Sequence, residues 1–170
     1  MEQIEDLDPN VIVEIGTAEG GSLYPWVRAV EPSSVISVDT TFLNRNLEFY
    51  TSFNTNKETK ISLIKANSQS QSTRDKLLEL LDDQEIDFLF IDADHQYDGV
   101  KKDFELYEPL VREGGVIAFH DILGENEVIG VGKLWQEVEP KYESETIISE
   151  DRKPLSDATT GGIGLIKKPE

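Results

Sequence analysis

The chain contains no cysteine among its 170 residues. This absence excludes disulfide bonds, thiolate metal sites, iron–sulfur clusters and cysteine nucleophiles. Positive charge is also scarce, because 16 lysine and arginine residues stand against 34 aspartate and glutamate residues, for a net charge of −18. Such a charge repels phosphate backbones and anionic lipid surfaces, so we expect neither nucleic acid nor a membrane as a partner.

Long hydrophobic runs and targeting signals are missing as well. No apolar run approaches the roughly 18 residues of a membrane span, and the first ten residues, MEQIEDLDPN, are acidic, unlike a signal peptide. We therefore expect a cytoplasmic protein. The length fits one domain over residues 1–170, and a hydrophobic content of 38% is enough for a packed core.

Seven short runs rich in aliphatic and β-branched residues predict strands. These runs are Val11–Gly16, Val35–Asp39, Ile61–Ala66, Ile86–Ala93, Gly114–Asp121, Tyr142–Ile148 and Gly161–Lys168. Apolar residues at helical spacing lie between most of them, over Leu23–Val30, Leu77–Leu81, Val100–Val111 and Val131–Val138. No helix separates the last two runs, so they should pair antiparallel. The pattern predicts an α/β protein with a Rossmann-like, doubly wound, mostly parallel sheet of about seven strands and an antiparallel last strand.

In such sheets ligands bind beyond the carboxyl ends of the strands. The first strand ends in EIGTAEGGS, where a glycine turn feeds a helix and exposes backbone N–H groups. Glu14 precedes this turn and would repel a pyrophosphate, which disfavours a dinucleotide. Asp39 ends the second strand, where a carboxylate can bind both hydroxyls of a ribose. The plainer alternative is that both acids only cap helices or face water.

The third strand runs into ANSQS, whose amides and hydroxyls can bond an adenine edge. Ser70 or Ser72 would equally explain this composition as a helix N-cap. The next two strand ends carry Asp92, Asp94 and His95, then His120 and Asp121, which include both histidines of the chain. Such donors on adjacent strand ends suit a divalent cation, or else form a hydrogen-bonded His–Asp pair that fixes a loop.

Six segments in order resemble the class I S-adenosylmethionine-dependent methyltransferases. They are EIGTAEGGS, SVDT, ANSQS, FIDADHQYDGVKKD, GGVIAFHDI and TGGIGLI, and the resemblance covers most of the chain, from Val11 to about Lys168. The likeness is greatest to the small O-methyltransferases that include cephalosporin-hydroxylase-like proteins, with catechol and caffeoyl-CoA O-methyltransferases as more distant relatives.

The resemblance implies a role for each matching position. The residues that would line the methionine half of the cofactor are Glu14, Gly16, Thr17, Gly20 and Ser22. Asp39 would hold the ribose, Ser68 and Gln69 would lie by the adenine, and Asp92 would face the cofactor. Asp92, His120 and Asp121 match the magnesium ligands of metal-dependent relatives, and His95 matches their substrate-activating lysine.

Two departures from that pattern bear on the chemistry. Histidine replaces the family's lysine at position 95, and His120 replaces an acid, which suits a transition metal better than Mg²⁺. Only ten residues precede the first strand, where relatives carry a segment that covers the acceptor. We therefore expect an acceptor site that is open, completed by a second subunit of a homo-oligomer, or covered by Ser149–Thr160.

The sequence thus predicts an S-adenosylmethionine-dependent, metal-assisted O-methyltransferase that acts on a small hydroxylated acceptor, with Mg²⁺ or Mn²⁺ and His95 as the catalytic base. Three alternatives remain open. One is a metal-independent methyltransferase in which His120 and Asp121 are structural. The second is a nucleotide-binding oxidoreductase, disfavoured by Glu14. The third is a non-catalytic adenosyl-binding module.

Overall fold

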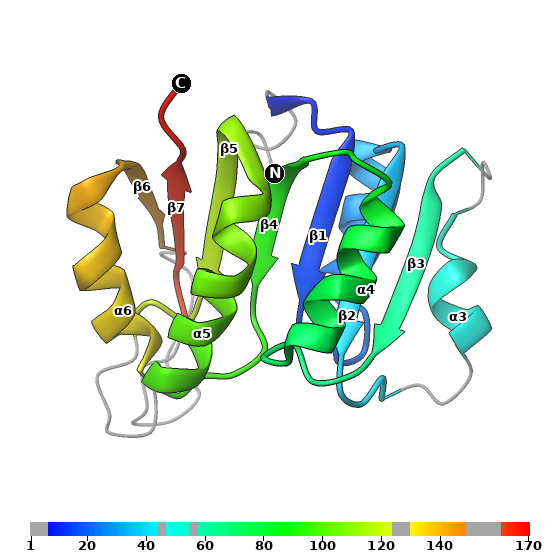
Figure 1. Ribbon diagram of the computed structural model, residues 1–170, viewed down its shortest axis with the longest axis horizontal. Helices are drawn as coiled ribbons and strands as arrows, with labels where there is room; N and C mark the ends of the chain where they lie inside the picture. Colours follow the sequence, from blue (N-terminus) through cyan, green and yellow to red (C-terminus); the bar gives the residue numbers. More distant parts are fainter. Residues whose placement is uncertain (1–6, 44–46, 55–57, 124–129, 149–160) are drawn as a thin grey trace.

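Seven strands form one sheet in the order β3-β2-β1-β4-β5-β7-β6 in a computed structural model that describes residues 7–43, 47–54, 58–123, 130–148 and 161–170 (Figure 1). The strands are β1 (Val11–Ile15), β2 (Ser34–Asp39), β3 (Lys60–Lys65), β4 (Ile86–Ile91), β5 (Val111–His120), β6 (Glu143–Ile147) and β7 (Ile163–Lys167). β1 to β5 are parallel, whereas β7 pairs antiparallel with β5 and β6. The predicted fold class is confirmed.

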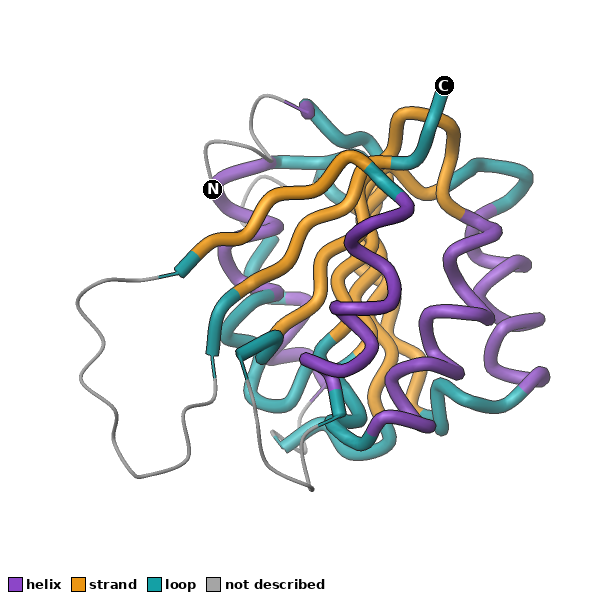
Figure 2. The backbone as a smooth tube through the Cα atoms, turned by 90° about the vertical axis from the view of Figure 1, so that its left-hand side faces the viewer, coloured by secondary structure: helices purple, strands orange, loops and turns teal. Residues whose placement is uncertain are grey.

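Helices cover both faces of the sheet (Figure 2). α4 (Gln71–Leu81), α5 (Tyr97–Tyr107) and α6 (Val131–Val138) lie on one face, where Leu77, Tyr107 and Trp135 pack against apolar strand residues. On the other face lie α2 (Leu23–Pro25), its π-helical continuation η1 (Trp26–Val30) and α3 (Leu47–Thr51). A doubly wound sheet with both faces covered explains why its strands read as continuous apolar runs.

Two local expectations need correction. Val111 was expected in the helix that begins near Val100, but α5 ends at Tyr107 and a short 3₁₀ turn, η2 (Glu108–Leu110), leads into β5 at Val111. Pro109 in that turn has no N–H for a helical hydrogen bond, so the helix cannot continue through it. The five-residue helix α3 was not predicted, because so short a segment carries little periodic signal.

Other expectations agree with the structure or lie outside it. The sequence predicted Ser70 or Ser72 as the N-cap of α4, and the structure shows Ser70 in this role. Its hydroxyl accepts a hydrogen bond from the backbone N–H of Thr73 at 3.2 Å. Ser149–Thr160 lies outside the described residues. Within the described ranges, no helix is long and apolar enough to cross a membrane.

The strand order reverses between β1 and β4, which are neighbours although they are far apart in sequence. At this point the chain leaves β1 through Gly16, whose φ of +97° favours glycine. A Cβ atom there would lie 2.2 Å from the carbonyl oxygen of Asp92. The ends of β1 and β4 therefore lie too close together for any side chain at position 16. The turns that follow these two strands are in contact as a result.

Candidate functional site

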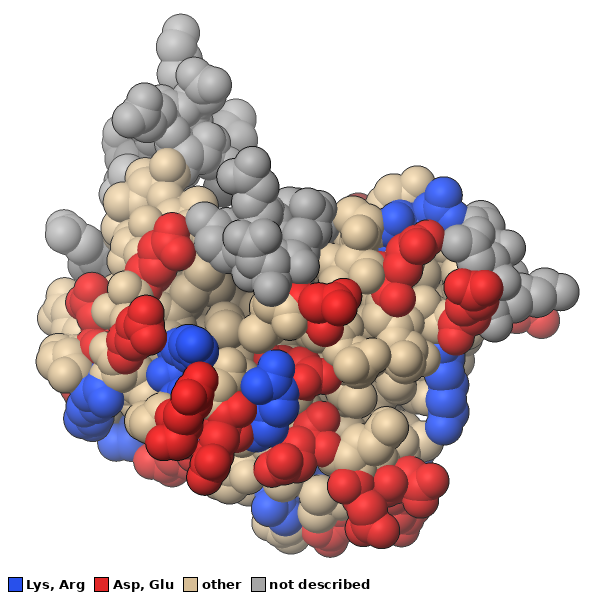
Figure 3. Space-filling model, turned by 90° about the horizontal axis from the view of Figure 1, so that it is seen from above, with Lys and Arg blue, Asp and Glu red and all other residues tan. Residues whose placement is uncertain are grey.

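A pocket of about 680 Å³ lies at the carboxyl ends of β1 to β4. Its lining comes from the turns after these strands: residues 16–18 and 22 after β1, 38–40 at the end of β2, 66–69 after β3 and 92–96 after β4. The described lining contains no lysine or arginine. The opposite end of the molecule, seen in Figure 3, shows lysine and arginine interspersed among acidic side chains. The pocket therefore suits a cationic or hydroxyl-bearing ligand better than a polyanion.

Asp39 fixes the turn that follows β1. Its Oδ2 atom accepts hydrogen bonds from the backbone N–H groups of Thr17 and Ala18, each at 2.8 Å. Its Oδ1 atom accepts one from Thr41, also at 2.8 Å. Among the described residues Oδ1 accepts from Thr41 alone, so its second lone pair can still accept a hydrogen bond from a ligand hydroxyl in the pocket.

Glu14 lies beneath this turn, and its exposed fraction is 0%. The hydroxyls of Ser22 and Ser37 and the indole N–H of Trp26 donate to its carboxyl group. Burial raises its pKa from 4.5 to about 7, although these donors lower it. Glu14 is therefore linked to the pocket by its hydrogen bond with Ser22, which lines the pocket. The Ser22 hydroxyl donates to Glu14 and does not cap α2. Gly20 is likewise buried, facing the ring of Tyr50.

Ser68 and Gln69 form the corner of the pocket after β3. Gln69 donates from Nε2 to Oδ2 of Asp94 at 2.8 Å, while Oδ1 of Asp94 accepts from the backbone N–H of Gln96 at 2.9 Å. This link between the β3 and β4 turns was not predicted. The signal was available, since Asp94 stands in the same run as Asp92 and His95, but sequence alone does not show which acid faces which turn.

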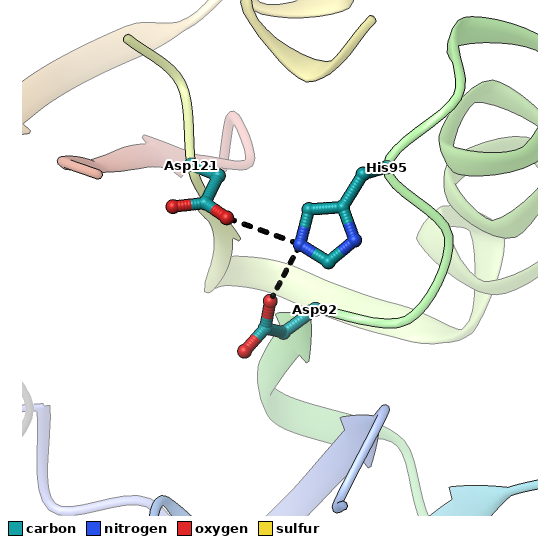
Figure 4. Close-up of side chains that lie close together, drawn as sticks. All are labelled: Asp92, His95 and Asp121. Carbon is teal, nitrogen blue, oxygen red and sulfur yellow. Dashed lines mark ion pairs between the residues drawn. The ribbon is translucent and has the colours of Figure 1, made fainter. Parts of the chain in front are cut away.

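Four ionisable side chains converge beside the pocket, at the ends of β4 and β5. His95 Nε2 lies 3.1 Å from Asp121 Oδ2 and 3.5 Å from Asp92 Oδ1 (Figure 4). His120 Nδ1 lies 3.3 Å from Asp92 Oδ1 and 3.3 Å from Asp121 Oδ1. The pairing of Ile91 with Phe119 explains this meeting, because the next residues in register are Asp92 and His120. The predicted convergence of these side chains is thus present.

The backbone also helps to aim these groups. Asp121 follows β5 with a φ of +62°, an uncommon left-handed conformation that aspartate tolerates better than most residues. Its N–H donates to the carbonyl of Gly162 at 3.0 Å, which ties the turn to the start of β7. Its carboxylate therefore points to the two imidazoles from a turn that is itself held by hydrogen bonds.

The cluster is electrostatically balanced by its own residues. The two carboxylates raise the pKa of His95 to about 10 and of His120 to about 9. The two imidazoles in turn hold the pKa of Asp121 well below its usual range, and they lower that of Asp92 despite its burial. Both histidines are therefore protonated at neutral pH as long as no other cation binds these carboxylates.

The donor set fits a divalent cation. Ligand atoms of Asp92, His95 and Asp121 all lie within 4.8 Å of one another. His120 Nδ1 is buried and makes no hydrogen bond of good geometry among the described residues, so it has unused capacity as a ligand. Two carboxylates with one or two imidazoles are ligands that Mn²⁺ and similar metals accept. The structure therefore supports either histidine as the third ligand, whereas the sequence suggested His120.

Comparisons with known proteins bear on this site. The model of the methyltransferase domain family matches residues 13–122. Protein R132 of Acanthamoeba polyphaga mimivirus is 37% identical over 120 residues, which cover 67% of this chain and 52% of that protein. Protein y4gI of Sinorhizobium fredii is 31% identical over 146 residues, which cover 79% of this chain and 16% of that protein. The chain thus spans about half or less of these two relatives.

Solved structures share the fold. The O-methyltransferase from Bacillus cereus, in complex with S-adenosylhomocysteine (SAH), has a TM-score of 0.63 at 20% identity, covering 98% of this chain and 78% of that one. MycE, in complex with Mg, SAH and mycinamycin VI, has a TM-score of 0.65 at 14% identity, covering 99% and 48%. TomG from Streptomyces achromogenes, in complex with S-adenosylmethionine, has a TM-score of 0.63 at 16% identity, covering 99% and 80%. With the family model matching residues 13–122, the resemblance drawn from the sequence is confirmed, and the chain belongs to the methyltransferase domain family.

Proposed function

We propose that the chain transfers the methyl group of S-adenosylmethionine to a hydroxyl oxygen of a small acceptor, with the help of a divalent cation. The observation that carries this proposal is the meeting of Asp92, His95, His120 and Asp121 at the edge of a pocket that the glycine turn held by Asp39 also lines. The solved relatives that bind SAH or S-adenosylmethionine, and in MycE also Mg, support it.

The pocket's own residues would bind the cofactor. The N–H groups around Gly16 and Thr17 and the hydroxyl of Ser22 would face its methionine half, with Glu14 beneath Ser22 and Gly20 behind the turn. Asp39 would accept from the ribose, and Ser68 and Gln69 would meet the adenine. The acidic lining favours the positive sulfonium and the positive amino group of the cofactor over a dinucleotide phosphate.

Asp92, His120 and Asp121 would hold the cation, which would leave the imidazole of His95 free to exchange a proton. Bound there, a divalent cation lowers the pKa of an acceptor hydroxyl. In the transfer the bond from sulfur to the methyl carbon breaks as the bond from the acceptor oxygen to that carbon forms. His95 Nε2, which faces both carboxylates (Figure 4), would take the hydroxyl proton once its ring is neutral. Holding the two reactants in line supplies much of the rate.

A second candidate is a metal-independent methyltransferase. The observation in its favour is that the histidines already compensate the two carboxylates. Its difficulty is that the same compensation keeps His95 protonated at neutral pH, so that it cannot act as a base. The cytoplasmic location and the absence of a nucleic-acid partner stay predictions from the sequence.

Calorimetric titration with SAH and with Mn²⁺ tests the proposal. We expect wild-type protein to bind both, Asp121→Ala to lose Mn²⁺ binding but keep SAH binding, and the exposed control Asp98→Ala to keep both. Formation of SAH from S-adenosylmethionine, measured over a panel of catechols, sugars and hydroxy acids, then identifies the acceptor. Equal turnover in EDTA and in Mn²⁺ would favour the metal-independent candidate, and a chain that binds neither SAH nor S-adenosylmethionine would refute both.

A further inference from the structure

The side-chain amide of Gln69 is held in one orientation by Asp94. Both residues line the pocket, and Gln69 Nε2 donates to Asp94 Oδ2 at 2.8 Å. An ionised carboxylate has only acceptor atoms, so the amide must present its NH₂ group to Asp94. The carbonyl oxygen Oε1 lies at the other end of the amide, where no described residue donates a hydrogen bond to it. The end of Gln69 that is left for a ligand is therefore an acceptor.

Asp94 is itself fixed by the turn that leads into α5. Its Oδ1 atom accepts a hydrogen bond from the backbone N–H of Gln96 at 2.9 Å. Its Oδ2 atom lies against Gly99 of α5, where an added Cβ atom would be 2.0 Å from Oδ2. A side chain at position 99 would therefore displace the carboxylate. The two oxygens of Asp94 thus have different partners, and Oδ2 is the one that binds Gln69.

The position of Gln69 in the pocket follows from the sheet. Asp39 and Lys65 pair in register at the ends of β2 and β3, so the turn after β3 begins beside the carboxylate proposed to hold the ribose. Within that turn the backbone N–H of Gln69 donates to Asn67 Oδ1 at 2.8 Å. The main chain and the side chain of Gln69 are therefore both held by hydrogen bonds. A residue held in this way loses little conformational freedom when a ligand binds.

We propose that Asp94 is a positioning residue that makes the pocket select adenine over hypoxanthine, because it fixes the Gln69 amide with its oxygen toward the base. This inference rests on the proposed function, which assigns the Ser68–Gln69 corner to the adenine of the cofactor. The exocyclic amino group of adenine donates hydrogen bonds, whereas the corresponding group of hypoxanthine is a carbonyl that only accepts. Gln69 Oε1 bonds the amino group and repels the carbonyl. A site built around a fixed acceptor rejects a ligand that brings a second acceptor.

The test is a substitution that turns the amide over. In Asp94→Asn the side-chain oxygen keeps the hydrogen bond from the Gln96 N–H, so the NH₂ group replaces Oδ2 and faces Gln69. Gln69 must then direct its oxygen toward position 94 and its own NH₂ group toward the base.

Calorimetric titration of the full chain in EDTA compares SAH with S-inosylhomocysteine, its hypoxanthine analogue. The wild-type chain should bind SAH at least about tenfold more tightly than the analogue, which is the effect of about one hydrogen bond. Asp94→Asn should bind SAH about tenfold more weakly and the analogue about tenfold more tightly than wild type, so that the preference reverses. Tighter binding of the wrong base is a result that general damage to the fold does not produce.

Two further variants serve as controls. Asp98→Asn removes the same charge from an exposed position at the start of α5, and it should leave the ratio of the two affinities within about twofold of wild type. Asp94→Ala lets the amide present either end to the base, so it should lower the preference for SAH about fivefold without reversing it. This second variant decides the question if Asp94→Asn does not fold.

Each outcome either supports or overturns the inference. A wild-type preference that survives in Asp94→Asn and Asp94→Ala would overturn it, and so would an equal loss of affinity for both ligands in these variants. Equal binding of SAH and S-inosylhomocysteine by the wild-type chain would do the same. All three results leave the proposed function standing, because SAH still binds. A wild-type chain that binds neither SAH nor S-adenosylmethionine would instead refute the proposed function, and the inference with it.

Discussion

The two halves of the candidate site are held together by different forces. At the ends of β1 and β2, backbone N–H groups and hydroxyls hold the carboxyl groups of Asp39 and Glu14. At the ends of β4 and β5, two carboxylates face two imidazoles through charge. The first half depends on neutral hydrogen-bond donors, whereas the ion pairs of the second half depend on the protonation of two imidazoles. Neutral donors suit the binding of a cofactor, and groups that can gain or lose a proton suit the reaction.

The largest effect should come from His95→Gln in the charged half. We expect methyl transfer to fall by about 10² to 10⁴, because loss of a general base acts on the transition state. SAH affinity, measured by calorimetry, should stay within about twofold, since the cofactor is held by the other half. His120→Gln serves as a comparison and should weaken Mn²⁺ binding more than it affects the proton transfer. A fall in SAH affinity as large as the fall in turnover would erase the distinction between the halves.

The next effect should come from Asp39→Ala in the hydrogen-bonded half. This change leaves three backbone N–H groups without their acceptor, so we expect a loss of about 1–2 kcal/mol in the free energy of unfolding. The rise in melting temperature on adding SAH should largely disappear, because that shift depends on affinity for the native state. The exposed Glu85→Ala should keep both the stability and the shift. An unchanged shift in Asp39→Ala would show that the cofactor does not use this wall.

A smaller effect is the dependence of stability on pH in metal-free protein. The raised pKa values of His95 and His120 mean that the folded state binds more protons than the unfolded state. Their contribution is complete below pH 6.5 and is lost as pH rises toward 9 and 10. Glu14 and Asp103 act in the same direction, because their buried ionised forms appear as pH rises toward about 7 and about 6.

The melting temperature in EDTA should therefore be highest near pH 5 and fall steadily toward pH 9, as followed by circular dichroism. The His95→Gln/His120→Gln double variant should lose the alkaline part of this slope and keep the part due to buried acids. A wild-type melting temperature that rises between pH 6 and pH 9 would contradict the assigned charge states.

Much of the fold was predictable, because buried parallel strands produce apolar runs that are visible without any alignment. The convergence of Asp92 and His95 with His120 and Asp121 was also predictable, since the carboxyl ends of neighbouring parallel strands meet. The alternation of side chains along a strand would have refined the expectation for Glu14. Glu14 alternates with Val13 and Ile15 and so shares the face of Ile12, beneath Trp26, rather than facing the pocket directly.

The role of α5 was harder to predict. Gly99, Asp103 and Tyr107 recur at intervals of four, which places them on one helical face, but nothing in that spacing shows that Asp103 is fully buried. An acid within a helix is usually solvent-exposed, and only the packing of α5 against the β3 turn makes this one an exception. Contacts between turns, such as that of Gln69 with Asp94, depend on loop conformations that local sequence does not determine.

The sheet ends at β6, which pairs only with β7 in the described part of the chain. Four of its five residues are exposed, and two of them are Glu143 and Glu145. A free strand edge is a template on which another extended chain can add, the first step of aggregation. Two like charges along a five-residue edge oppose that step, since an identical strand laid beside it would bring acid against acid. The acidic character of the chain thus protects this edge of the sheet from pairing with a second copy.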